Sequence, residues 1–94
     1  MEYEELRQAL EILSLSEKAT LREIKARHRD LVKRFHPDAG GGEPERIRQI
    51  NAAYGVLSAY CRDYRFSFTR EEFLAQNPEK RLQQQFAQDP IWGG

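Results

Sequence analysis

The chain has 94 residues, which is enough for one small domain and too few for two. Hydrophobic residues make up 39% of it and charged residues 32%, a composition typical of a globular domain rich in helix. No apolar run approaches the roughly 20 residues needed to span a bilayer, and the acidic start at residues 1–5 is unlike a signal peptide. We therefore expect a cytoplasmic protein that does not associate with a membrane.

The single cysteine, Cys61, excludes a disulfide within the chain. A zinc site would have to combine Cys61 with His28 and His36, which are scattered and lack the paired spacing of zinc ligands. We therefore expect no metal and no cofactor. Cys61 is interpreted as a half-buried residue of a helix.

The first predicted helix runs from Tyr3 to Leu13, because Leu6, Leu10 and Leu13 recur on one face. Residues 1–17 carry five acidic residues and one basic residue, whereas residues 21–36 carry six basic and two acidic residues. The formal net charge of the whole chain is zero. This asymmetry nevertheless predicts a basic face that could meet an acidic partner.

The second predicted helix follows Thr20, which forms a capping-box pattern with Glu23, and it ends at Phe35. Its apolar stripe consists of Leu21, Ile24, His28, Leu31 and Phe35. Pro37 ends the helix, because its ring is excluded from a helix interior and moves the preceding residue out of the α region. On this stripe His28 is interpreted as a packed or boundary histidine.

Pro44 suits the first turn of a third helix, after a glycine-rich loop at residues 40–42. Its predicted inward face consists of Ile47, Ile50, Tyr54 and Leu57. Gly55 interrupts this helix and indicates either close packing or an exposed weak spot. Two antiparallel helices with a third braced across them make an all-α fold, and no segment alternates for long enough to be a strand.

Residues 1–65 are predicted to form the main domain and residues 66–94 a helical extension. Thr69 and Asn77 are start signals for two short helices in the extension. The extension contains more apolar residues than a solvent-exposed polar tail would have. We expect it either to fold back on the domain and enlarge its core, or to bind a client or partner through Phe86, Ile91 and Trp92.

Charges flank the apolar stripe of the second helix on both sides. On one flank, Glu23 with Arg27 and Asp30 with Arg34 have the spacing of favourable acid–base pairs. The other flank carries basic residues with no acid among them: Arg22, Lys25, Arg29 and Lys33. These four extend over about 16 Å and lead into the turn at residues 36–38, His-Pro-Asp, whose proline holds the two polar side chains in a defined relation.

Together these features resemble the J-domain family of co-chaperones over about residues 5–64. The resemblance is carried by residues 13–15, 19–20, 22–25, 31–38 and 50–57. It implies a helical fold with an antiparallel hairpin of the second and third helices. It also implies that the chain binds a DnaK-type heat shock protein 70 chaperone and stimulates its ATP hydrolysis, so that the chain itself is no enzyme. The implied contacts are His36, Pro37, Asp38, Lys25, Arg29 and Lys33, with Arg22 as a further candidate.

The chain departs from the family pattern at four positions. Ser14 stands where glycine is common, Ala39 where a base is usual, His28 where tyrosine is frequent and Asp30 where a base is frequent. These departures predict docking that is weaker or tuned to one partner, and they leave the turn at residues 36–38 unchanged. The sequence contains no Gly/Phe-rich linker and no CxxC module of the kind that binds clients in full-length DnaJ, and it leaves the client unknown.

Three alternatives stay open. The chain could be a J-like regulatory or adaptor module that binds without stimulating hydrolysis, or its basic flank could be a solvated face that serves solubility alone. It could also be a small helical domain that binds nucleic acid along the phosphates, although the zero net charge and the acidic first helix argue against this. An enzyme built on His36, Asp38 and Cys61 is disfavoured, because nothing brings them to a shared face.

Overall fold

The structure is a computed structural model that describes residues 1–36, 38, 43–80 and 82–83. In these ranges it contains no strand, and its main helices are α1 (Tyr3–Ile12), α2 (Leu21–Phe35), α3 (Pro44–Asp63) and α4 (Arg70–Gln76). The predicted all-α fold is confirmed. The chain divides into two compact units, Met1–Tyr64 and Arg65–Gly94.

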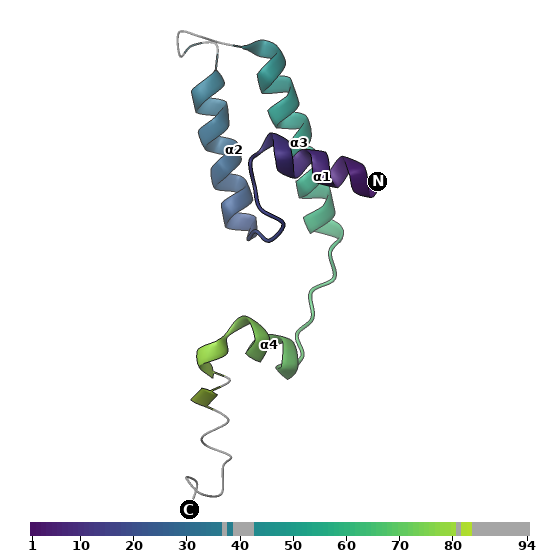
Figure 1. The fold of residues 1–94 in the computed structure, drawn as a ribbon, viewed down its shortest axis with the longest axis vertical. Helices are drawn as coiled ribbons and strands as arrows, with labels where there is room; N and C mark the ends of the chain where they lie inside the picture. Colours follow the sequence, from purple (N-terminus) through teal and green to yellow (C-terminus); the bar gives the residue numbers. More distant parts are fainter. Residues whose placement is uncertain (37, 39–42, 81, 84–94) are drawn as a thin grey trace, which may run out of the picture. The chain divides into compact units, whose positions relative to one another are not determined.

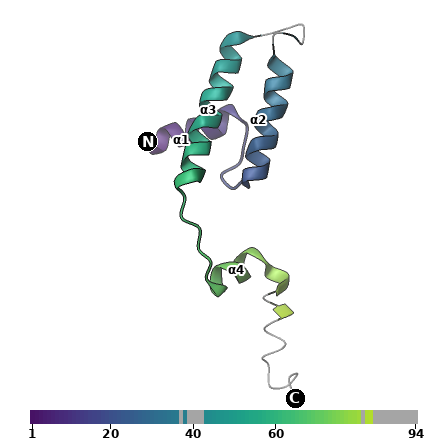
Figure 2. The ribbon, with the colours of Figure 1, turned by 180° about the vertical axis from the view of Figure 1, so that it is seen from behind.

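In the first unit, α2 and α3 run antiparallel side by side, and α1 lies across α3 (Figure 1). The view from behind shows the same arrangement (Figure 2). Both α1 and α2 pack on α3, which is therefore the central helix of the unit. Because the hairpin is antiparallel, the C-terminal end of α2 and the N-terminal end of α3 lie at the same end of the unit.

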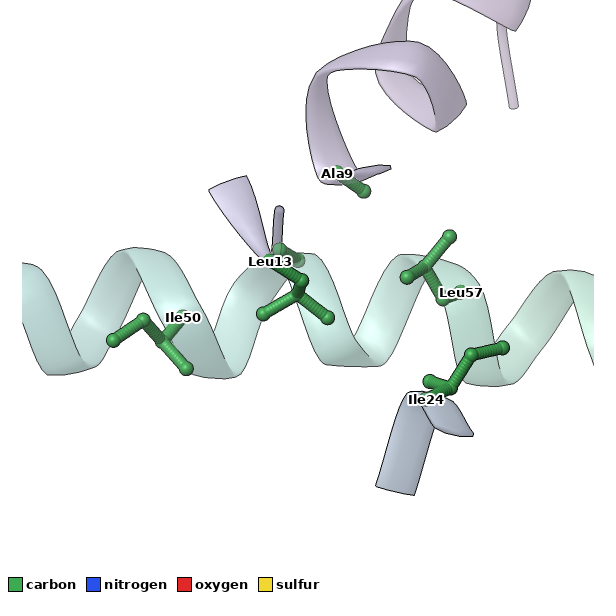
Figure 3. Close-up of a cluster of buried hydrophobic side chains, with 6 residues drawn as sticks. Ala9, Leu13, Ile24, Ile50 and Leu57 are labelled. Atoms are coloured by element: carbon green, nitrogen blue, oxygen red, sulfur yellow. The ribbon is translucent and has the colours of Figure 1, made fainter. Parts of the chain in front are cut away.

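The core of the first unit lies where α1 and α2 meet α3 (Figure 3). Its buried side chains are all apolar: Ala9, Leu13, Ile24, Ile50, Ala53 and Leu57. On the predicted inward face of α3, Ile50 and Leu57 are buried, whereas Ile47 and Tyr54 are half-buried. Burial of a large aliphatic side chain stabilises a fold by about 1.5–3 kcal/mol. Each of the few large aliphatic residues in this small core therefore contributes substantially to its stability.

The capping box at the start of α2 is present, as the sequence predicted. Thr20 Oγ1 accepts a hydrogen bond from Glu23 N at 3.1 Å, and Glu23 Oε1 accepts one from Thr20 N at 3.2 Å. These bonds satisfy N–H groups that a helix start leaves unpaired. At the other end, His36 has φ −66° and ψ 139°, so the chain leaves the α region after Phe35, at the predicted position.

Just beyond the C-cap of α1, Ser14 lies in the left-handed region, with a φ of 54°. Leu15 N donates a hydrogen bond to Leu10 O at 2.9 Å, which pairs one of the carbonyls that a helix end leaves open. Glycine adopts this conformation freely, whereas a residue with a Cβ is disfavoured by roughly 1–2 kcal/mol. The serine is therefore locally unfavourable at a position where the resembled family commonly has glycine.

The exposed side of α1 carries a small charge network. Arg7 forms ion pairs with both Glu4 and Glu11, one turn to either side, and Arg7 Nε lies 3.1 Å from Glu4 Oε2. The hydrogen bond from Arg7 lowers the pKa of Glu4, and the same bond is the main cause of a raised pKa at Arg7.

The glycine inside α3 is an exposed weak spot and not a site of close packing. Gly55 is exposed, and a Cβ added there would find no neighbouring atom within 4 Å. The structure thus decides between the two explanations that the sequence left open.

The second unit contains α4, whose N-cap Thr69 accepts a hydrogen bond from Glu72 N at 3.2 Å. Lys80 N donates to Asn77 O at 2.9 Å and residues 78–80 are helical, so both predicted helix starts are found. Phe86, Ile91 and Trp92 lie outside the described residues. The packing of residues 66–94 on the first unit, or their docking on a partner, stays a prediction.

Candidate functional site

Four basic side chains form what we call the cationic face of α2: Arg22, Lys25, Arg29 and Lys33. All four are exposed, and their spacing of three and four residues aligns them along one side of the helix. In the part of the chain that the structure describes, none of them forms an ion pair. The face is therefore a row of positive charges that α2 does not neutralise itself.

The acid–base pairs predicted on the other flank of α2 are not found. Glu23 Oε1 is taken by Thr20, accepting from both its backbone N–H and its hydroxyl, because the capping box competes for this carboxylate. Among the described residues, Asp30 and Arg34 form no ion pair either, and the Arg34 guanidinium lies 5.8 Å from the centre of the Phe35 ring. Neither Arg27 nor Arg34 is therefore ion-paired in the way that the spacing indicated.

His36 and Asp38 interact where α2 ends, at the end of the row of charges. Asp38 N donates a hydrogen bond to His36 Nδ1 at 3.1 Å, and Asp38 Oδ2 lies 3.6 Å from the same nitrogen. The two side chains are 49% and 92% exposed, so the carboxylate is open to a partner. Pro37, the third residue of the predicted site, lies outside the described residues.

Phe35 connects the end of α2 to the start of α3. The guanidinium of Arg46, in the first turn of α3, lies 4.9 Å from the centre of the Phe35 ring. Glu43 N donates a hydrogen bond to Phe35 O at 3.3 Å. Arg46 was not predicted as part of the site, because no local pattern indicates which residue of the next helix meets Phe35.

His28 supports α2 from the side that faces α3. Its ring stacks on Tyr54 with 4.0 Å between the ring centroids and 8° between the planes, and Nε2 lies 2.9 Å from Asn51 Oδ1. The half-buried His28 is thus a boundary histidine in a structural contact, as predicted.

Among the residues that the structure describes, no group of three or more His, Cys, Asp or Glu side chains could hold a metal ion. Cys61 is a free, half-buried thiol in α3. In the same ranges, no helix has both the length and the apolar character that a membrane crossing requires.

Comparison with protein families matches residues 8–63, more than half of the chain, to the DnaJ domain. The chain belongs to the DnaJ-domain family, which confirms the resemblance drawn from its sequence. Members of this family are in general co-chaperones of heat shock protein 70.

Curated relatives agree with this assignment. An uncharacterised 19.0 kDa protein from Sinorhizobium is 47% identical over 58 residues, covering 56% of this chain and 34% of that protein. The chaperone protein DnaJ of Finegoldia magna is 46% identical over 50 residues, covering 50% of this chain and 13% of that protein. A DnaJ-like protein of Mycoplasma pneumoniae is 44% identical over 48 residues, covering 51% of this chain and 16% of that protein.

The chain therefore spans between about an eighth and a third of the length of these relatives, and the similarity is to part of each protein. No solved structure matches the chain.

Proposed function

We propose that this chain is a co-chaperone that binds a DnaK-type heat shock protein 70 chaperone and stimulates its ATP hydrolysis. In this proposal the cationic face of α2 docks on an acidic surface of the chaperone, and His36, Pro37 and Asp38 complete the contact. The main support for this proposal is that the cationic face leads directly into the turn: a row of exposed bases without ion pairs to any described residue ends at an exposed histidine–aspartate pair. The chain acts in the cytoplasm, needs no cofactor and leaves the chemistry of hydrolysis to its partner.

The two parts of the site have different physical tasks. Exposed charges act over a distance of about a Debye length, so the cationic face steers the encounter and makes it sensitive to salt. Asp38 offers a charge-assisted acceptor to a base of the partner, a contact that is short-ranged and directional. We therefore expect bases of α2 to set the association rate and the turn to set the specificity.

The test is single-turnover ATP hydrolysis by a DnaK-type chaperone, titrated with the full chain. We expect stimulation by the native chain and none by its His36→Gln variant. Lys33→Gln should raise the half-saturating concentration by up to about fivefold, the strength of one exposed ion pair, and more at low salt than at high salt. Lys18→Gln is the matched control, because Lys18 is also exposed but precedes α2, and it should behave like the native chain.

A folded native chain that gives no stimulation would refute the proposal. Binding to the chaperone in that case would indicate a J-like adaptor, and salt-sensitive binding to duplex DNA would indicate a nucleic-acid-binding domain.

For the extension, we propose that the apolar residues near its end, Phe86, Ile91 and Trp92, either enlarge the core or bind a client. Trp92→Ala separates these two roles. A lower unfolding temperature of the first unit would show that the extension packs on it. An unchanged unfolding temperature would favour docking on a partner.

A further inference from the structure

We propose that Arg46 and Phe35 form a clamp between the ends of α2 and α3, and that this clamp positions His36 and Asp38 for the chaperone. The inference rests on the proposed function for its consequence in docking, whereas the clamp itself is a property of this chain. Arg46 is thus assigned as a positioning residue that acts through Phe35.

The clamp has two components, one from a side chain and one from the backbone. The Arg46 guanidinium lies 4.9 Å from the centre of the Phe35 ring, within the range of a cation–π contact. Glu43 N donates to Phe35 O at 3.3 Å. The last residue of α2 is therefore tied to the start of α3 by both its ring and its carbonyl.

The environment of Arg46 favours this assignment over a role in an ordinary surface ion pair. Arg48, two residues further along α3, pairs with Glu45 at 3.3 Å. Arg46 forms no ion pair with any described residue, although Glu43 and Glu45 are close in sequence. A planar guanidinium stacks on an aromatic ring better than a lysine ammonium does, which explains how an arginine serves here.

The turn itself has few other connections to α3. His36 and Asp38 bond to each other, and among the described residues neither makes a hydrogen bond or ion pair with α3. Their placement relative to α3 therefore depends on Phe35 and Glu43 at the two helix ends. If the clamp is released, a smaller fraction of molecules has the competent arrangement, and the apparent affinity falls in proportion to that fraction.

The first measurement is amide hydrogen exchange of the full chain by NMR, which needs no chaperone. Phe35→Leu and Arg46→Gln should each reduce the protection of the Glu43 amide by about two- to fivefold, the strength of an exposed cation–π contact. Phe35→Tyr keeps the ring and Arg48→Gln removes an equal charge from the same turn, so both should keep the native protection. Equal protection in Arg46→Gln and Arg48→Gln would overturn the clamp.

The second measurement is the titration of ATPase stimulation described above. Phe35→Leu and Arg46→Gln should raise the half-saturating concentration about two- to fivefold and leave the maximal stimulation unchanged, and the double variant should be no worse than the more affected single variant. Phe35→Leu should also retain the native salt dependence, because Arg46 is still charged.

Additive effects, or a change in Arg46→Gln alone, would mean that Arg46 touches the partner directly and would overturn the positioning role. A native chain that does not stimulate hydrolysis refutes the proposed function, and in that case the exchange data still decide whether the clamp exists.

Discussion

Replacing Gly55 by alanine should stabilise the first unit by about 1 kcal/mol. Glycine in a helix interior is about 0.8–1.0 kcal/mol less favourable than alanine, partly because the unfolded chain has more freedom to lose. Gly55 lies well inside α3 (Pro44–Asp63) and is exposed, and its added Cβ would meet no atom within 4 Å, so no steric penalty offsets the gain. For a unit of this size, 1 kcal/mol corresponds to about 4–8 °C in the unfolding temperature.

The assay is urea and thermal unfolding of the full chain followed by circular dichroism. The midpoint should rise at an unchanged denaturant slope, since the variant alters stability and not the surface exposed on unfolding. Ala52→Gly is the matched control, because Ala52 is exposed on the same helix and should lose about the same amount. A Gly55→Ala variant that is no more stable than the native chain would refute the reasoning, and so would an Ala52→Gly variant without loss.

Three further predictions follow from the helix ends and from α1. Ser14→Gly should stabilise the unit by about 1 kcal/mol in the same unfolding assay, because the φ of 54° then carries no steric penalty; a loss would show that the serine side chain matters more than the backbone. Thr20→Ala should destabilise the unit by about 1 kcal/mol through loss of the capping box, whereas Thr20→Ser should be close to native in stability. An unchanged unfolding midpoint in Thr20→Ala would contradict a stabilising role of the capping box. The hydrogen bond from Arg7 lowers the pKa of Glu4, so its stabilising effect should be present above the ordinary value of 4.5 and disappear as the pH falls through the lowered pKa. Glu4→Gln should therefore be less stable than the native chain at neutral pH and equal to it in acid, and a difference that persists in acid would contradict this.

Much of the fold could be predicted from the sequence because its determinants are local. Thr20 and Glu23 are three residues apart, and Pro37 acts on its immediate neighbour, so the two ends of α2 follow from short-range rules. The period of Ile50 and Leu57 likewise identifies one face of α3. The bases of the cationic face are three or four residues apart, so their alignment on one side of α2 could be predicted from the sequence.

The features that could not be predicted depend on side chains with more than one possible partner and on contacts between helices. The spacing of Glu23 and Arg27 indicates a pair, but the same carboxylate serves the cap. Phe35 and Arg46 meet across a loop, and only the packing of α2 on α3 determines which side chain of α3 reaches the ring. Gly55 had two explanations because a sequence does not show whether a third element approaches that face.

The unpaired bases of α2 also imply that helix stability and the proposed docking place opposite demands on this surface. Like charges one turn apart destabilise a helix by about 0.2–0.5 kcal/mol per pair, and the four bases of the cationic face form three such neighbouring pairs. An acidic substitution among them should therefore raise the melting temperature while weakening the proposed docking. Selection for thermal stability alone would replace these bases. Binding of an acidic partner of the proposed kind would instead relieve the repulsion and stabilise the domain by linkage.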